Sequence, residues 1–225
     1  MGIIMINRNL EIIIIIFSFL ICRQLVKSQE LIIGKQVWMM KNLNVDHYQN
    51  GDSIPEIKDP VQWEKLTTGA WCYYENNSEN GKVYGKLYNW FAVEDPRGLA
   101  PNGWHIPSDS EWKELEICLG MTNESVDSMH WRGNIEGIKL KESGITHWES
   151  TNFATNESGF TALPGGWRIE DGRFFRIGLN GLWWSTSVGC DMHAYYRNLN
   201  NSETKIYRAN HNPKCGFSVR CIKNK

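Results

Sequence analysis

Apolar residues in the first half of the chain recur with the periods of short strands and helices. Residues 31–43 predict an opening strand pair that turns at Gly34 and Lys35. Residues 84–93 carry apolar side chains at helical spacing, which predicts a helix there. The first half is therefore expected to open on a hairpin and to continue into helical structure.

The clearest predicted helix begins after Ser108. Ser108 is a favourable N-cap, and Glu111 three residues later completes a capping box. Gly120 is expected to end this helix, and a weaker helix is predicted over residues 135–142. Four residues form the apolar face of the first helix: Trp112, Leu115, Cys118 and Leu119.

In the second half, glycines separate short aromatic runs, which predicts β-hairpins and long irregular loops. Residues 198–212 are rich in asparagine, with Tyr207 and Arg208 among them. They are interpreted either as an exposed hairpin with hydrogen-bonding side chains or as an ordinary solvated strand pair. Residues 217–222 alternate like a closing strand. Helices followed by short strands predict an α+β domain rather than a βαβ repeat.

The N-terminus has the pattern of an export signal. An almost unbroken apolar run covers residues 12–22 and follows Arg8. This run is too short for a membrane span, which needs about 20 residues, and it has the length of a signal-peptide core. We expect residues 1–28 to be a signal peptide and residues 29–225 to be one secreted or cell-envelope domain. A lipid anchor at Cys22 and an uncleaved anchor are the alternatives.

Composition narrows the classes of function. The net charge of −1 argues against a phosphate-driven nucleic-acid binder, and 41% hydrophobic residues are enough for a packed core. Eleven tryptophans and 20 glycines indicate either a loop-rich fold packed around indoles or a surface that stacks on flat ligands. The motifs of serine hydrolases, zinc proteases and nucleotide-binding enzymes do not occur, so we expect no enzyme activity and no cofactor.

The cysteines after the leader are odd in number, which leaves at least one of them unpaired. Cys118 lies on the apolar face of the predicted helix and is expected to be free. Export permits disulfides among the others. Those four allow three connectivities, of which we favour Cys72–Cys221 and Cys190–Cys215.

A zinc site is the alternative to the second disulfide. Cys190 and His193 stand on one side of a short segment, and His211 and Cys215 stand on the other. Exported thiols oxidise, however, and this ligand order is not a common finger pattern. The disulfide is therefore the preferred interpretation, and two separate unpaired thiols are the third.

Six ordered motifs give the chain a family resemblance. They are WMMKNL at 38–43, GKLYNW at 85–90, APNGWHIPSDSEW at 100–112, GFTALPGG at 159–166, LWWSTS at 182–187 and GFSVRC at 216–221. In this order they resemble the Fibrobacter succinogenes major paralogous domain, a family of exported bacterial proteins. The resemblance extends from about residue 34 to residue 223, and Cys72 and Cys221 match cysteine positions of that family.

The resemblance implies a fold and export from the cell, but it implies no activity. The family is more distantly similar to the C-type lectin-like and formylglycine-generating-enzyme folds. This similarity implies short antiparallel sheets, two to three helices, long irregular loops and chain ends that meet in a sheet. The chain lacks the Glu-Pro-Asn and Trp-Asn-Asp motifs of sugar-binding calcium sites, and it has no convincing pair of reactive cysteines. We therefore expect no bound metal and no catalytic residue.

Aromatic and polar residues in the Gly-rich loops are the candidates for ligand binding. Indole faces stack on the apolar faces of sugars, while amide and guanidinium groups hydrogen-bond hydroxyls. The alternative is that these indoles fill the core, as expected for Trp38, Trp104, Trp112 and Trp184. The candidate ligand-binding residues are Trp148, Trp167, Arg168, Arg173, Asn180 and Trp183.

Two histidine positions have both a chemical and a structural interpretation. His105 is either a general base or a hydrogen-bonded residue that fixes the turn before the helix. His147 and Glu149 either form an acid–base pair, since alternate strand residues share a face, or lie in a solvated loop. The structural interpretation is preferred for both.

The expected function is therefore a non-catalytic binding module for a glycan or another surface polymer. The alternative is a structural or display domain that binds protein partners through variable loops. A sugar-binding module should expose tryptophans beside carboxamides in a concave site, whereas a display domain should bury its indoles.

Overall fold

The computed structural model describes residues 30–149 and 153–225, so the predicted leader, residues 1–28, lies outside the described residues. Contacts join Leu31–Lys225 into one unit. None of the helices in the described ranges is long and apolar enough to cross a membrane.

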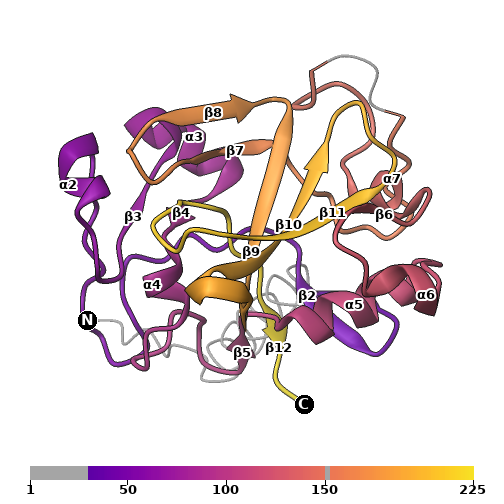
Figure 1. Ribbon diagram of the computed structural model, residues 1–225, viewed down its shortest axis with the longest axis horizontal. Helices are drawn as coiled ribbons and strands as arrows, with labels where there is room; N and C mark the ends of the chain where they lie inside the picture. The colour runs from indigo at the N-terminus through magenta and orange to yellow at the C-terminus, as the bar shows by residue number, and fades with distance from the viewer. Residues whose placement is uncertain (1–29, 150–152) are drawn as a thin grey trace, which may run out of the picture. The chain divides into compact units, whose positions relative to one another are not determined.

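The opening hairpin and the closing strand lie in the same four-stranded sheet (Figure 1). Gly34 has a φ of +59°, in the left-handed region, and makes the turn of the predicted opening hairpin. Ile222 lies opposite both Trp38 and His105 in antiparallel pairs. The hairpin and the meeting of the domain's two ends are thus confirmed. The strands, in sheet order, are β1 (Glu30–Ile33), β2 (Gln36–Met39), β12 (Ile222–Lys223) and β5 (Trp104–His105).

A larger, six-stranded sheet forms the second half of the domain (Figure 1). Its three central strands are antiparallel, and β7 joins β9 in parallel at Gly166 and Gly181. The strands, in sheet order, are β6 (His130–Arg132), β11 (Ile206–His211), β10 (Ala194–Asn200), β9 (Asn180–Val188), β7 (Gly165–Arg168) and β8 (Phe174–Ile177).

Six α-helices occur in the described residues, and only α5 is longer than seven residues. The fold is α+β as predicted, but it has more helices than the expected two to three. Side chains of Asn77, Asn89 and Thr122 cap helices of seven, four and four residues, which are too short to show a clear hydrophobic period. The helices are α2 (Pro60–Glu64), α3 (Ser78–Tyr84), α4 (Trp90–Val93), α5 (Asp109–Cys118), α6 (Asn123–Val126) and α7 (Glu136–Leu140), with 3-10 turns η1 (Tyr74–Asn76) and η2 (Cys190–Met192).

The predicted start of α5 is confirmed in detail. The Ser108 side chain accepts from the Glu111 backbone N–H, and the Glu111 carboxylate accepts from the Ser108 N–H at 2.8 Å. Gly120 follows the C-cap with a φ of +110°, as expected of a helix-ending glycine. The weaker predicted helix is also present, as α7.

The single helix predicted over residues 84–93 is wrong. Gly85 has a φ of +77° and ends α3, after which β4 (Leu87–Tyr88) pairs with β3 (Trp71–Cys72). The Asn89 side chain then caps α4. The apolar spacing here reflects residues that are buried in consecutive short elements, not one face of a helix.

The closing segment does not alternate between core and solvent as predicted. Every residue from Phe217 to Ile222 is buried, because the segment crosses between strands of different sheets. Phe217 bridges to Tyr88, and Ser218 bridges to Trp183. The Arg220 side chain is bonded internally, to Asn42 and to the Phe160 carbonyl, so its charge does not indicate exposure.

Indoles occupy the centres of the two larger core clusters. Trp38 and Trp112 pack with ring centroids 4.9 Å apart between the first sheet and α5. Trp184 stacks on Phe217 at 4.1 Å in the other cluster. These three tryptophans are core residues as predicted, whereas Trp104 is only partly buried.

Candidate functional site

The predicted tryptophan platform is not exposed. Trp148 and Trp183 are each 1% exposed. The Trp148 indole N–H donates to the Ala162 carbonyl at 3.0 Å, and that of Trp183 donates to Asn42 Oδ1 at 2.9 Å. Buried indoles with satisfied N–H groups are core residues, so the assignment of these two residues to a ligand surface is corrected.

Two of the predicted polar ligand contacts are also buried. Arg168 has no exposed surface and donates to three backbone carbonyls, including that of Ile57 at 2.6 Å. Asn180 is 4% exposed and exchanges amide hydrogen bonds with Asn198 and Asn200. Both side chains hold loops and strands together, because a buried polar group must find partners inside the protein.

Only Trp167 and Arg173 of the predicted set have accessible side chains. Trp167 is partly exposed and stacks on Phe175 with ring centroids 6.0 Å apart. Arg173 lies 5.5 Å from the same ring and pairs with Asp171 at 2.7 Å. They form a small cluster on the β7–β8 hairpin, not a platform that continues to Trp148 or Trp183.

A different set of partly exposed side chains lies on the face of the sheet beside its β6 edge. Trp131 lies opposite Tyr207, which lies opposite Asn198, and directly opposed residues point to the same face. The Trp131 and Tyr207 ring centroids are 4.9 Å apart. His130 Nδ1 lies 2.9 Å from the Tyr207 hydroxyl, and the Asn180 amide holds Asn198 Oδ1 at 2.8 Å. We call Trp131, Tyr207 and Asn198 the aromatic row.

The predicted disulfides are wrong. All five cysteines of the described residues are free. Cys72 and Cys221 are buried in different hydrophobic clusters, and Cys190 is exposed while Cys215 is buried. Cys118 is free as predicted, but it is exposed rather than part of the apolar face.

The pH dependence of stability tests whether Cys221 is an unpaired thiol. Burial raises its pKa to about 12 from 9.0. The unfolded chain loses this proton first, so the thiol's contribution to stability is complete below about pH 9. It falls as the pH rises toward the folded pKa, by about 1.4 kcal/mol per pH unit. We expect Cys221→Ala to remove about that much of the slope in urea unfolding measured from about pH 9.5 to 10.5.

The matched control for that measurement is Cys118→Ala, because the Cys118 thiol is exposed. Its slope should equal that of the wild type under the same reducing conditions. An unchanged slope in Cys221→Ala would show that the pKa of this thiol does not differ between the folded and the unfolded chain.

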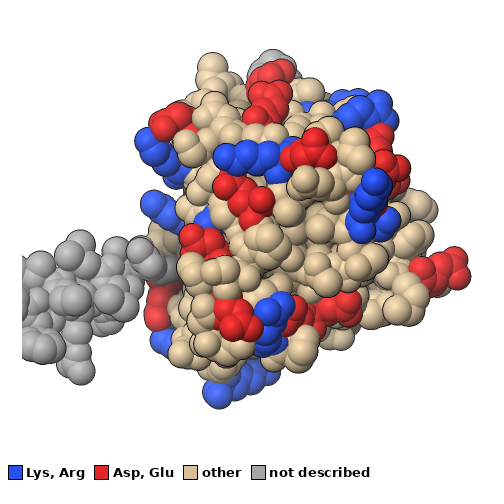
Figure 2. All heavy atoms as spheres, turned by 90° about the vertical axis from the view of Figure 1, so that its left-hand side faces the viewer, with Lys and Arg blue, Asp and Glu red and all other residues tan. Residues whose placement is uncertain are grey.

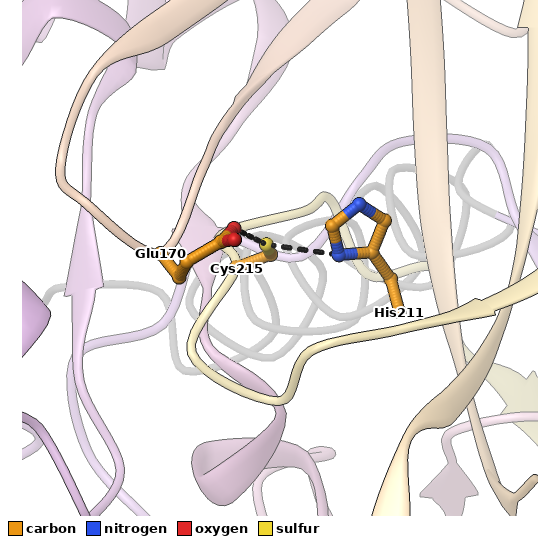
Figure 3. Close-up of side chains that lie close together, drawn as sticks. All are labelled: Glu170, His211 and Cys215. Atoms are coloured by element: carbon orange, nitrogen blue, oxygen red, sulfur yellow. Dashed lines mark hydrogen bonds between the residues drawn. The ribbon is translucent and has the colours of Figure 1, made fainter. Parts of the chain in front are cut away.

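A polar cluster joins the β7–β8 turn to the loop after β11 (Figure 3). The Cys215 Sγ lies 3.2 Å from Glu170 Oε2 and 3.2 Å from His211 Nδ1. One ligand atom from each of the three residues lies within 4.8 Å of the others. Cys215 is fully buried, whereas Glu170 and His211 are partly exposed. The cluster is therefore the strongest group of metal-ligand side chains in the described part of the chain.

Protonation in this cluster follows from burial and hydrogen bonding. Burial raises the pKa of the Cys215 thiol far above its usual value, and Glu170 raises it further. Burial lowers the pKa of His211, and the Asn212 N–H donates to its Nδ1 at 2.9 Å. Burial alone would raise the pKa of Glu170, but hydrogen bonds from its own N–H and from Cys215 lower it overall. A protonated thiol is a weak nucleophile, so this geometry does not favour cysteine catalysis.

Only two of the four predicted zinc ligands, His211 and Cys215, lie in one group. His211 and Cys215 are adjacent as the spacing predicted, but Glu170 takes the third place. Cys190 is exposed on η2 and does not belong to this group. His193 is close enough for its charge to lower the pKa of His211.

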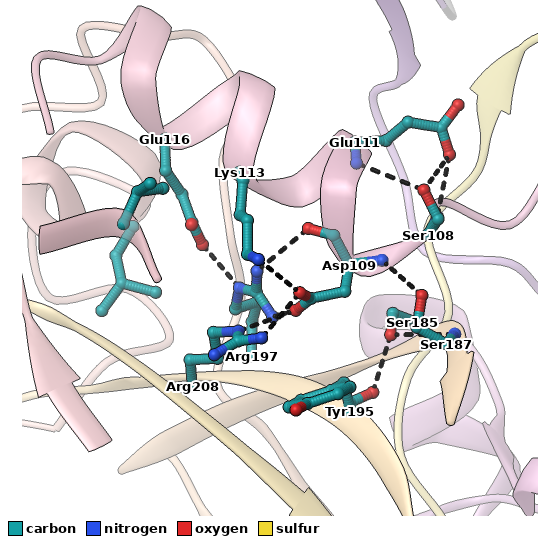
Figure 4. A network of polar contacts seen from close by, with 12 residues as sticks. Ser108, Asp109, Glu111, Lys113, Glu116, Ser185, Ser187, Tyr195, Arg197 and Arg208 are labelled. Carbon is teal, nitrogen blue, oxygen red and sulfur yellow. Dashed lines mark hydrogen bonds and ion pairs between the residues drawn. The ribbon is translucent and has the colours of Figure 1, made fainter. Parts of the chain in front are cut away.

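A buried ion-pair network joins α5 to the six-stranded sheet (Figure 4). Arg197 donates to Asp109 Oδ1 at 2.8 Å and to Glu116 Oε1 at 2.5 Å. Arg208 donates to both oxygens of Asp109, at 2.9 and 2.8 Å. Arg132 pairs with the second oxygen of Glu116. Each carboxylate oxygen thus accepts from at least one cation.

Charge pairing keeps the Asp109 carboxylate of this network ionised. Burial would raise the pKa of Asp109, but hydrogen bonds from Arg208 and Arg197 hold it well below its usual range. Lys113, at the rim, adds a contact of 3.1 Å to the same carboxylate. An ionised carboxylate such as that of Asp109, with both oxygens hydrogen-bonded, suits a structural role better than proton transfer, which requires a group that titrates near the working pH.

The two histidine positions also have structural partners. His105 lies 2.7 Å from Asn224 Oδ1 and 2.9 Å from Glu111 Oε1, in line with the hydrogen-bonded alternative. His147 contacts Glu142 at 2.9 Å, not Glu149, so the proposed His147–Glu149 pair does not form.

The face that carries α2 and α3 has mixed charge. Figure 2 shows Lys and Arg side chains interspersed with Asp and Glu over this face. On α3, Lys82 pairs with Glu79 at 2.7 Å, and near α2 Lys58 lies 3.4 Å from Glu56. This face therefore offers no continuous surface of one charge.

Comparison with known proteins identifies the domain type. The family model for the Fibrobacter succinogenes major domain matches residues 31–223, nearly the whole described chain. No curated protein and no solved structure matches the chain. The comparisons therefore give a family without an assigned activity, and function must be argued from the side chains.

Proposed function

The chain belongs to the Fibrobacter succinogenes major domain family, and from that premise we propose that it is an exported, non-catalytic binding domain for a glycan or another surface polymer. The aromatic row is its contact surface. Partly exposed aromatic rings beside carboxamides are the groups that contact the apolar faces and hydroxyls of sugars.

The observation that carries this proposal is the side-by-side placement of Trp131 and Tyr207 next to Asn198. The three residues come from adjacent strands, so the sheet fixes their spacing. The Asn180–Asn198 hydrogen bond and the His130–Tyr207 contact hold the polar ends of the row in place. A surface that is ordered before binding loses less side-chain entropy when the ligand arrives.

Three further features support a binding domain in the cell envelope. Burial raises the pKa of the Cys72 and Cys221 thiols, and Arg197 and Arg208 are held in buried ion pairs, which suits a rigid scaffold. The meeting of β2 with β12 is compatible with the proposed C-type lectin-like architecture, in which both ends enter one sheet. The apolar run at residues 12–22 supports export.

Binding of a protein partner through loops is the second candidate. Val188 and Met192, at the β9–β10 turn, are 50% and 73% exposed. Asp191 and Met192 have φ values of +52° and +62°, which are costly for residues other than glycine. A strained, apolar turn of this kind favours contact with another protein surface.

A glycan array probed with the full chain, with and without a metal chelator, tests the first candidate. We expect binding that survives the chelator and that Trp131→Ala weakens at least about tenfold, the loss typical of a contact residue worth about 1.4 kcal/mol. Trp104→Ala is the matched control, because Trp104 is also partly exposed but lies in the other sheet.

The controls separate a contact role from a folding role. Both variants should keep the near-ultraviolet circular dichroism of the wild type. Equal weakening by Trp104→Ala would contradict the aromatic row as the contact surface. Wild-type protein that binds no glycan or polymer on the array would overturn the proposal and favour the protein-partner alternative.

A further inference from the structure

The Cys215 cluster places two acceptors around one proton. The thiol has a single hydrogen, yet Glu170 Oε2 and His211 Nδ1 both lie 3.2 Å from Sγ. The Asn212 N–H donates to Nδ1 at 2.9 Å, so this nitrogen carries no proton, and an ion that binds its single lone pair displaces this hydrogen bond. Three electron-rich atoms thus converge on one buried point, an arrangement that a cation satisfies better than a single hydrogen does.

Backbone hydrogen bonds hold the three residues in this arrangement. The turn that carries Glu170 is closed by the Ile169 N–H, which donates to the Arg173 carbonyl at 2.9 Å. The Cys215 N–H donates to the Asn212 carbonyl at 3.0 Å, which closes the turn after His211. Reciprocal bonds between Arg168 and Gly216, of 2.9 and 2.7 Å, tie the two turns together. The frame is therefore built before any ion arrives.

We propose that Glu170, His211 and Cys215 bind one divalent transition-metal ion, with Zn²⁺ as the preferred ion. A thiolate, an imidazole and a carboxylate are the ligand types that zinc takes in proteins, at bond lengths of about 2.0–2.3 Å. Such bonds in a tetrahedron separate neighbouring ligand atoms by about 3.6 Å. The observed separations, from 3.2 Å to at most 4.8 Å, include this value.

Metal binding exchanges one proton for one ion. The Cys215 S–H bond breaks, an S–Zn bond forms, and the proton leaves to solvent. Glu170 and His211 supply lone pairs, and a water molecule takes the fourth position. The ion joins the β7–β8 turn to the loop after β11, segments 45 residues apart at the Cys215–Glu170 contact. Because all described cysteines are free, no disulfide competes for this thiol.

The test measures metal content and affinity on the full chain, purified under reducing conditions. The protein is stripped with a chelator, dialysed against Zn²⁺ alone and analysed by mass spectrometry for bound zinc. We expect one zinc ion per wild-type chain. Replacement with Co²⁺ should give a thiolate-to-cobalt charge-transfer absorption that Cys215→Ser abolishes.

Matched variants locate the site. Glu170→Gln keeps the size of a partly exposed side chain, so it tests the site even if Cys215→Ser folds poorly. We expect Glu170→Gln to weaken binding at least about 100-fold, since losses of 10- to 100-fold follow from outer-shell changes alone. Cys190→Ser and His193→Gln are the cysteine and histidine controls, and both should retain one zinc ion.

Three results would overturn the proposal. The first is a wild-type chain that holds no zinc after dialysis. The second is zinc affinity unchanged in both Glu170→Gln and Cys215→Ser. The third is loss of zinc from Cys190→Ser or His193→Gln with retention by Glu170→Gln, which would assign the metal to the other ligand set. None of these results bears on glycan binding, which the array measures separately and which is expected to survive the chelator.

Discussion

Replacement of Arg197 by methionine is expected to lower the free energy of unfolding by about 3–5 kcal/mol, the usual cost of removing one partner from a buried ion pair. The Arg197 guanidinium is 1% exposed and bonds both Asp109 and Glu116. Methionine leaves Glu116 with Arg132 alone, in a region that water does not reach. Urea unfolding at neutral pH measures the change.

Lys113→Met is the control for the network. Its ammonium group lies at the rim and contacts the same Asp109 carboxylate, so we expect a loss of only about 0–1 kcal/mol. Arg197→Lys separates charge from geometry, because a single ammonium group cannot bond both carboxylates as the guanidinium fork does. If Arg197→Met and Lys113→Met have equal effects, the buried pairs do not stabilise the fold as described.

Local signals in the sequence predicted the elements that depend only on local interactions. The capping box at Ser108 and the turn at Gly34 needed no distant partner, and both are present. The helix predicted over residues 84–93 failed because its spacing arose from tertiary burial of β4 and α4. Hydrophobic periodicity cannot distinguish these two causes in elements of two to four residues.

The sequence indicates the acidic half of the ion-pair network but not its pairing. Asp109 and Glu116 are seven residues apart, so they share the α5 face that carries Trp112. Acidic residues on an apolar helix face indicate buried cations, and Arg197 and Arg208 occur within strands of otherwise mixed burial. Their pairing depends on strand register, which the sequence alone did not supply.

The candidate sites depended on contacts between segments that are far apart in the chain. The spacing of His211 and Cys215 was recognised, because both lie in one turn, but Glu170 is 45 residues from Cys215 and comes from another hairpin. The aromatic row was missed in part because Trp131 joins Tyr207 only through the β6–β11 pairing. The Gly-rich loops suggested exposure for Trp148, although its indole is buried and donates to the Ala162 carbonyl.

Trp184→Ala is expected to destabilise the domain by about 3–5 kcal/mol, the range for removing a buried tryptophan from a packed core. Trp184 has no exposed surface, stacks on Phe217 at 4.1 Å and lies edge-on to Tyr196 at 6.3 Å. Its indole N–H also donates to the Tyr88 carbonyl at 2.9 Å. Alanine removes the ring between β9 and the closing segment, and urea unfolding measures the loss.

Trp184→Phe tests whether ring packing or the hydrogen bond carries this effect. Phenylalanine keeps an aromatic ring against Phe217 but has no N–H. The Tyr88 carbonyl still accepts from the Phe217 N–H at 3.1 Å, so no buried acceptor loses its last partner. We therefore expect a loss of about 1–2 kcal/mol for this variant, the hydrogen bond itself contributing about 1 kcal/mol. Equal losses in Trp184→Phe and Trp184→Ala would assign the effect to the indole hydrogen bond and contradict ring packing as the main source of stability between β9 and the closing segment.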